Sequence, residues 1–147
     1  MTLAVEQAAA EGARVVTGPA ARLRPVPAAG WYTCPTVLDG VTLGMTVARD
    51  EVFGPVLAVL TADDVDSAIA LANDTEYGLA VSVWTCDVSL AHRVSRRLRA
   101  GTVWVNCYEE GDMTVPFGGY KQSGNGRDKS AHALEKYTEL KTTWIAL

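Results

Sequence analysis

The chain has 147 residues, 48% of them hydrophobic, and a formal net charge of −4. This length fits one domain on the usual prior of ~100–200 residues. The negative charge argues against nucleic acid or an anionic membrane surface as the main partner. The first twelve residues carry Glu6 and lack a basic start, and no apolar run approaches the ~18 residues of a membrane helix. We therefore expect a cytoplasmic protein with no signal peptide.

The first fifty residues alternate short regular elements with loops. Alanine-rich sequence followed by Gly12 predicts an opening helix. A stretch with three prolines and two glycines predicts a long loop between two short strands. In chain order we expect a helix at 3–11, a strand at 13–17, a loop at 18–32, a strand at 35–38 and a helical turn at 45–51.

The middle of the chain alternates apolar runs with helical patterns. We expect strands at 55–61, 78–85 and 102–106, with helices at 63–73 and 87–100 between them. Continuous apolar runs are typical of strands buried on both faces. Helical crossovers between such strands indicate an α/β protein with a parallel, three-layer sheet.

The two predicted helices are amphipathic. Asp63 or Asp64 can cap the first, and Gly101 is expected to end the second. The predicted inward residues are Val65, Ala68, Ile69 and Ala72 on the first helix, and Val88, Ala91, Val94 and Leu98 on the second. The arginines at 93, 96, 97 and 99 are expected to face outward, near a helix end that favours cations.

A glycine-rich segment at 111–130 follows the last buried strand after Asn106. Structureless loops beyond about 12–15 residues are usually functional or disordered, and ligands of parallel sheets bind beyond the strands' carboxyl ends. The segment lacks the Lys-Ser/Thr ending of a phosphate-binding loop. It is either the wall of a pocket or a packing and interface loop. A short helix at 130–137 and a terminal strand at 139–147 follow.

Several side chains are candidates for chemistry. Glu51 offers a carboxylate that accepts two hydroxyls, and Phe53 a ring for a planar heterocycle; the alternative is a turn with a surface Glu and a core Phe. Asp112 either meets an amine-bearing substrate or caps a turn. The three cysteines, at 34, 86 and 107, form no disulfide or zinc pattern and are expected to be reduced.

A catalytic thiol needs a lowered pKa and a base. Cys107, at a strand end, is the best-placed thiol. The two histidines, His92 and His132, are interpreted as surface or packing residues. No catalytic residue and no metal ligand is therefore assigned.

Four segments follow one another along the chain: DEVFGPVLAVL, LANDTEYGLAVSVWTCD, AGTVWVNCYEEGDMTVPFGGYKQSGNGRDKS and LEKYTELKTTWIAL. Together they resemble the C-terminal third of the NAD(P)-dependent aldehyde dehydrogenase family. The match is weakest over residues 1–29. The loop with HALEKYTELKT is similar to bacterial gamma-glutamyl-gamma-aminobutyraldehyde dehydrogenases of putrescine breakdown.

The resemblance implies roles for particular residues. Glu51 is similar to the carboxylate that binds the nicotinamide ribose of NAD or NADP, and Phe53 to the ring beside the nicotinamide. Phe117 is similar to the aromatic residue near the aldehyde pocket. Residues 109–113, with Asp112 and Met113, resemble the variable loop at the pocket mouth.

The resemblance also implies a domain organisation. Residues 1–136 are expected to be the C-terminal part of the catalytic domain, with a substrate loop at 106–128. Residues 137–147 are expected to be an oligomerisation strand. The partners implied are a small-molecule aldehyde and either a second copy of the chain or an N-terminal portion of the enzyme.

The chain departs from the family in one respect. It contains neither a Gly-Gln-x-Cys nucleophile segment nor a Glu-Leu-Gly-Gly general-base segment. In this family a cysteine thiolate attacks the aldehyde, so we expect a truncated fragment that is inactive by itself. The alternatives are an inactive interaction module that docks on a full-length relative through its terminal strand, and an unstable remnant with exposed edges.

Overall fold

The computed structural model describes residues 1–18, residue 30 and residues 32–147. Nearly all of the loop predicted at 18–32 therefore lies outside the described residues. The chain divides into two compact units, Met1–Asp64 and Val65–Leu147, each of which is described by itself. The boundary falls inside the predicted 1–136 domain, whose assignment stays a prediction.

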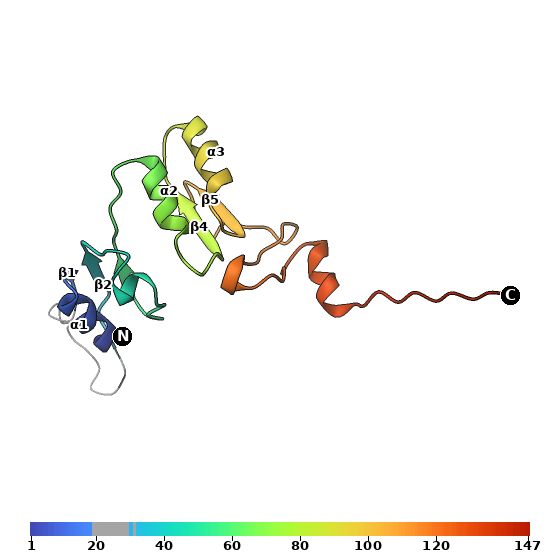
Figure 1. Cartoon of the computed structure of the whole chain (residues 1–147), viewed down its shortest axis with the longest axis horizontal. Coiled ribbons are helices and arrows are strands. Elements are labelled where there is room, and N and C mark those ends of the chain that lie inside the picture. Colours follow the sequence, from blue (N-terminus) through green and yellow to red (C-terminus); the bar gives the residue numbers. More distant parts are fainter. Residues whose placement is uncertain (19–29, 31) are drawn as a thin grey trace. The chain divides into compact units, whose positions relative to one another are not determined.

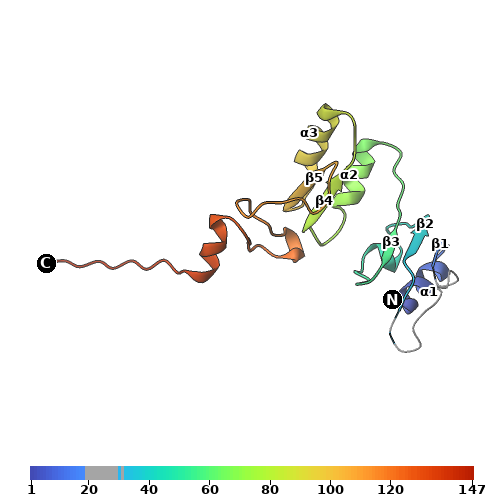
Figure 2. The same cartoon turned by 180° about the vertical axis from the view of Figure 1, so that it is seen from behind.

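The first unit is a small sheet with a helix. It contains α1 (Thr2–Ala10), β1 (Arg14–Thr17), β2 (Thr36–Asp39), the 3-10 helix η1 (Thr46–Ala48) and β3 (Val56–Ala58). The strand order is β1-β2-β3, with β1 antiparallel and β3 parallel to β2. Figures 1 and 2 show these elements. The elements predicted at 3–11, 13–17, 35–38 and 45–51 are confirmed.

A compact core holds the first unit together. Leu38 of β2 is fully buried at its centre. The other buried apolar side chains are Val5, Ala8, Ala13, Val41 and Met45. Above this core, Glu11 accepts hydrogen bonds from the Thr46 N–H at 2.8 Å and from Gln7 Nε2 at 2.9 Å. The Glu11 carboxylate thus fixes the start of η1 to the end of α1.

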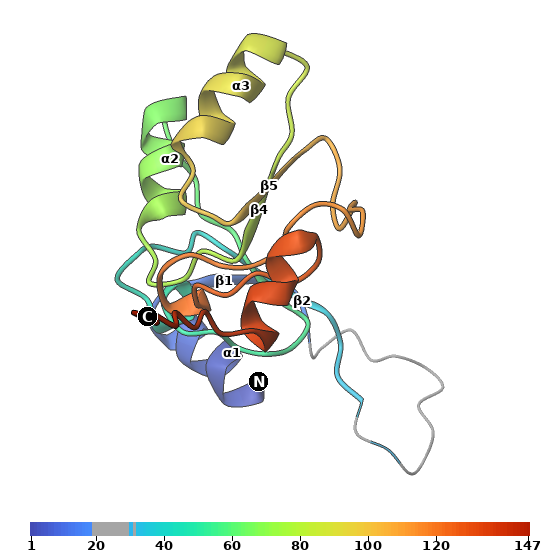
Figure 3. The same ribbon diagram turned by 90° about the vertical axis from the view of Figure 1, so that its right-hand side faces the viewer.

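The second unit carries two helices and a parallel strand pair. In chain order it contains α2 (Val65–Asn73), β4 (Ala80–Val83), α3 (Val88–Arg97), β5 (Thr102–Val105) and the 3-10 helices η2 (Lys121–Ser123) and η3 (Ala131–Tyr137). β4 and β5 pair in parallel from Ala80–Thr102 to Val83–Val105. α2 and α3 lie side by side next to this pair (Figures 1 and 3), and Ile69, Val94 and Leu98 form the core between them.

The α/β class with parallel strand pairing is confirmed, but one continuous sheet is not. β3 belongs to the sheet of β1 and β2, whereas β4 and β5 form a separate two-stranded sheet. The strands are also less buried than predicted. Leu57 of β3 is 60% exposed and Ala80 of β4 is exposed. Strands of three and four residues with few neighbours leave one side of each uncovered within this chain.

Helix α3 differs from the predicted helix in two details. Val88 is 69% exposed because it is the first helical residue, directly after the cap Asp87, whose carboxylate accepts from the N–H groups of Ser89 and Leu90. The helix ends at Arg97 with extended Leu98 as its C-cap, so Gly101 does not end it. Ala91, Val94 and Leu98 are buried, and the four arginines face outward, as predicted.

The C-terminal segment at 139–147 forms no strand in the structure. Its backbone is extended and its side chains are exposed, including Trp144 at 90%. A strand needs a partner to supply its hydrogen bonds, and the segment has none within the described chain. The oligomerisation role stays a prediction. Among the described residues, no helix combines the length and apolar character needed to span a bilayer.

Candidate functional site

The first group of candidate residues lies between η1 and β3 of the first unit. Glu51 is exposed, and the Phe53 ring is 89% exposed. The interpretation of Phe53 as a core residue is therefore wrong. Phe53 also has a φ of 50°, which is a genuine outlier for a bulky side chain. Residues held in such conformations cluster at ligand-binding sites. The segment therefore presents an aromatic ring and a carboxylate to solvent in a conformation typical of such sites.

The second group lies beyond the carboxyl ends of β4 and β5. Asn106, with a φ of 55°, bridges the two strand ends. Its Oδ1 accepts from the Thr85 N–H at 2.8 Å, and its Nδ2 donates to the Thr85 carbonyl at 2.8 Å. From the sequence, Asn106 was predicted only as the end of a strand. Its signal was an amide residue at the point where a buried strand stops, a position that tolerates left-handed backbone.

A cleft of about 350 Å³ opens beside β5. It is lined by Thr102, Trp104, Glu109, Glu110, Gly111, Val115, Pro116, Phe117 and Lys129. Phe117, predicted near the aldehyde pocket, is therefore part of this cleft. Asp112 and Met113 do not line it, whereas Glu109 and Glu110 of the predicted 109–113 loop do. The walls combine aromatic rings with carboxylates and one ammonium group.

Asp112 caps a turn. Its carboxylate accepts from the Thr114 N–H at 2.8 Å and from Thr114 Oγ1 at 2.7 Å. These hydrogen bonds, with the nearby charge of Lys129, lower the pKa of Asp112 below its usual value. The contacts correspond to the turn-capping alternative. Met113 is exposed, and its carbonyl accepts from the Ser130 N–H at 2.7 Å, which closes the base of the loop.

Phe117 is fixed in the cleft wall by a short antiparallel bridge. Its N–H donates to the Asp128 carbonyl at 2.9 Å, and the Asp128 N–H donates back at 2.7 Å. The Lys129 ammonium lies 5.8 Å from the centre of the Phe117 ring. On the other side, Trp104 Nε1 donates to the Glu110 carbonyl at 2.6 Å. The cleft walls are therefore held by backbone as well as by side chains.

The glycines of the loop permit close packing. A Cβ added to Gly101 would lie 1.7 Å from the Gly118 carbonyl oxygen, and one on Gly119 would lie 2.4 Å from the Ser123 Cβ. Only glycine fits where two backbones approach so closely. The loop is thus a packing segment over 118–123, and its preceding residues line the cleft. Both interpretations offered by the sequence apply, to different parts of it.

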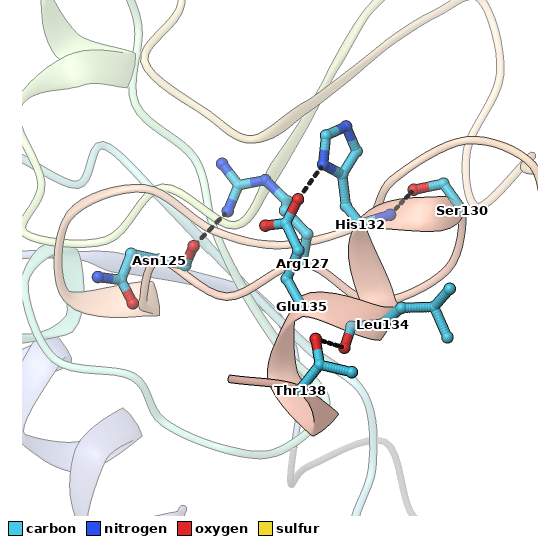
Figure 4. Close-up of polar contacts among 7 residues, drawn as sticks. All are labelled: Asn125, Arg127, Ser130, His132, Leu134, Glu135 and Thr138. Atoms are coloured by element: carbon cyan, nitrogen blue, oxygen red, sulfur yellow. Dashed lines mark hydrogen bonds and ion pairs between the residues drawn. The ribbon is translucent and has the colours of Figure 1, made fainter. Parts of the chain in front are cut away.

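The end of the loop is held by Arg127, shown in Figure 4. Its Nη1 donates to the carbonyls of Gly119 at 2.9 Å, Gly126 at 2.8 Å and Asn125 at 3.3 Å. The Tyr120 ring lies 5.4 Å from the Arg127 guanidinium and 5.4 Å from that of Arg99. The sequence did not predict these contacts, because most of the acceptors are backbone carbonyls, which every residue has.

The two histidines contact groups other than a cysteine thiol. Figure 4 shows His132 Nδ1 at 3.2 Å from Glu135 Oε1 and the His132 N–H bonded to Ser130 Oγ at 3.3 Å. His92 is exposed on α3. Cys107 is half-buried, and its carbonyl accepts from Ser82 Oγ at 2.7 Å. All three cysteines lie among the described residues and are thiols rather than disulfides.

Comparison with known proteins gives the class to which this fold and these segments belong. The model of the aldehyde dehydrogenase family matches residues 1–143, and the chain belongs to that family. The family prediction is therefore confirmed.

Individual relatives support the same assignment. The chain is 62% identical over 113 residues to "NADP/NAD-dependent aldehyde dehydrogenase PuuC" of Escherichia coli, covering 77% of this chain and 23% of that protein. It is 58% identical over 118 residues to the aminoacetaldehyde dehydrogenase of Pseudomonas aeruginosa, covering 80% and 24%. The solved indole-3-acetaldehyde dehydrogenase AldA of P. syringae, in complex with NAD+ and IAA, is 57% identical with a TM-score of 0.86, covering 97% and 28%. The chain spans about a quarter of the length of these relatives.

Proposed function

We propose that this chain forms part of an aldehyde dehydrogenase that oxidises an aldehyde to the carboxylic acid with NAD+ or NADP+. The family assignment supports the reaction, and relatives named for NAD and NADP support the cofactor. The observation that carries the proposal is the exposed ring of Phe53, held at positive φ two residues after the exposed Glu51.

The residues of this segment fit a nicotinamide nucleotide. An ionised carboxylate accepts several hydrogen bonds, so Glu51 would hold the two hydroxyls of a ribose. A solvent-facing ring offers a flat apolar surface to a planar heterocycle, so Phe53 would lie against the nicotinamide. When bound, such a cofactor supplies the oxidising chemistry. The chain's own residues bind and orient it.

The cleft beside β5 fits the substrate end of this reaction. Phe117 and Trp104 provide apolar walls, while Glu109 and Glu110 bring two carboxylates. A carboxylate attracts a cation over several ångströms at the low ionic screening of a cleft. We therefore propose that the substrate is an amine-derived aldehyde, including the aldehydes of putrescine breakdown. Asp112 and Met113 would act from the loop behind the cleft rather than from its lining.

The exposed terminal segment favours a second candidate function. Leu140, Trp144, Ile145 and Leu147 are all largely exposed, and an extended apolar segment with unpaired backbone can add to the edge of another sheet. We propose that residues 137–147 pair with a second aldehyde dehydrogenase chain. In the alternative, this contact is the whole function, and the chain is a catalytically inactive interaction module.

The decisive test is a Glu51→Gln variant in the protein at the length that its gene encodes. The amide keeps the shape but loses the charged acceptor, so we expect the cofactor Kd to rise about tenfold, with the aldehyde KM unchanged. Glu6→Gln, another exposed carboxylate of the first unit, is the matched control. An unchanged cofactor Kd in Glu51→Gln would remove the assignment.

A second measurement separates the two candidate functions. The 147-residue chain alone is expected to produce no NADH from aldehydes, because it contains no Gly-Gln-x-Cys segment. NADH production that Cys107→Ala abolishes would contradict this. If the gene-length protein is also inactive but changes the mass of a full-length relative on mixing, the interaction module is favoured.

A further inference from the structure

We propose that Lys121 is a positioning residue that anchors the cleft wall carrying Phe117 to the C-terminal end of α2. Its effect on aldehyde oxidation rests on the proposed function, whereas its effect on the loop does not. Lys121 is the first residue of η2 and is exposed. From sequence alone it would be a solvated lysine of a loop.

The side chain of Lys121 ends on two backbone carbonyls. Its ammonium Nζ donates to the Asn73 carbonyl at 2.8 Å and to the Thr75 carbonyl at 2.9 Å. Asn73 is the last residue of α2. The final carbonyls of a helix have no partner within the helix and carry its negative dipole end. A lysine with three donors satisfies two acceptors there at once.

The point that Lys121 contacts is itself fixed. Asn73 Nδ2 donates to the Arg97 carbonyl at 2.9 Å, and Asn73 Oδ1 accepts from the Arg99 N–H at 2.8 Å. Asn73 therefore joins the C-terminal ends of α2 and α3. Lys121 adds the loop as the third element of this junction. The loop is thus tied both to the end of α2 and to the segment that follows it.

The backbone around Lys121 follows the chain segment before β4. The Tyr120 N–H donates to the Gly78 carbonyl at 2.8 Å, and the Gln122 N–H donates to the Glu76 carbonyl at 2.9 Å. Lys121 has a φ of 53°, a conformation that a residue with a Cβ keeps only when surrounding contacts hold it. The two ammonium hydrogen bonds of Lys121 and the backbone hydrogen bonds of Tyr120 and Gln122 are the contacts around it.

The anchor is linked closely to the cleft. Phe117 is four residues before Lys121, and two of the three residues between them are glycines whose backbones are in close contact with neighbours. Residues 117–121 can therefore move little relative to one another. A shift at Lys121 moves the Phe117–Asp128 bridge, whose hydrogen bonds are 2.9 and 2.7 Å. Substrate-positioning walls are sensitive to such shifts, because misplacement of about 1 Å can cost a factor of ~100.

The test compares Lys121→Met, Lys121→Arg and Gln122→Met in the gene-length protein. Methionine keeps the length but removes the donors, while arginine can still donate to two carbonyls. The Gln122 side chain makes no hydrogen bond in the described part of the chain, so Gln122→Met is the matched control. Hydrogen exchange at the Phe117 and Asp128 amides and steady-state kinetics with an aldehyde are measured for each.

We expect Lys121→Met to speed exchange at both amides about tenfold, since two charge-assisted hydrogen bonds are lost. The aldehyde KM should rise by a similar factor, with kcat and cofactor KM within about twofold. Lys121→Arg should restore most of both. If exchange and KM match the wild type, or if Gln122→Met shows the same changes, the anchor is refuted. A wild-type protein that oxidises no aldehyde refutes the proposed function, and the exchange measurement still decides the anchor.

Discussion

Replacing Gly101 with alanine tests the packing of the cleft loop against the start of β5. The added Cβ would lie 1.7 Å from the Gly118 oxygen, 2.8 Å from the Gly118 carbonyl carbon and 3.3 Å from Gly119 Cα. All three are backbone atoms, which cannot move aside as the end of a flexible side chain can. Overpacking typically costs about 1–3 kcal/mol, and this contact is at the upper end. We therefore expect a loss of about 3 kcal/mol in the free energy of unfolding.

Urea unfolding followed by tryptophan fluorescence measures this loss. With an m-value of about 2 kcal/mol per molar urea, the midpoint should fall by about 1.5 M. Gly126→Ala is the control in the same loop, since its Cβ would meet only the flexible Lys136 side chain at 3.6 Å. A Gly101→Ala midpoint as high as that of Gly126→Ala would refute the close packing of Gly101 on Gly118, and with it the fixed cleft wall.

Two further outcomes follow from contacts in each unit. Leu98→Ala should lower the free energy of unfolding by about 2 kcal/mol, because Leu98 is buried in a core that opens to clefts. Val88→Ala, at an exposed position, should change it by no more than about 0.5 kcal/mol. Equal losses in urea unfolding would show that Val88 packs inward after all. Hydrogen bonds from Gln7 and Thr46 lower the pKa of Glu11, so its stabilisation is complete above the unfolded pKa and is lost as the pH falls through the folded pKa. Glu11→Gln should therefore destabilise the protein at pH 7 and converge with the wild type in acid, and a pH-independent difference would exclude ionisation as the cause.

Local patterns predicted where the helices lie, because each helix carries its own signals. They were wrong for Ala68 and Ala72, which were expected to face inward on α2 and are exposed. The burial of Ala91, Val94 and Leu98 follows from their spacing along α3, whereas the cap at Asp87 was not predicted. The parallel pairing of β4 with β5 follows from the helix between them. The helix that follows β3 does not predict its partner in the same way, because β3 pairs with β2. The pattern around β3 resembles that around β4, and only long-range hydrogen bonds distinguish the two pairings.

The candidate site also has some features that the sequence predicted and others that it did not. The sequence identified Glu51, Phe53 and Phe117 as residues of interest through their family segments. It could not show that Phe53 is exposed at positive φ, because that orientation depends on where η1 and β3 fix the chain. Nor could it decide between a substrate role and a turn cap for Asp112, since the choice depends on the distance to Thr114.

The sequence by itself determined the family, the glycines that the loop requires, and the helices and strands of both units except the strand expected at 139–147. Those features depend on residue type and short spacing along the chain. The tertiary structure alone decided which strands share a sheet, which residues line the cleft, and that Lys121 ends on the carbonyls of Asn73 and Thr75. Lys121 lies 48 positions from Asn73 and 46 from Thr75, and backbone carbonyls, which every residue has, give no signal in the sequence.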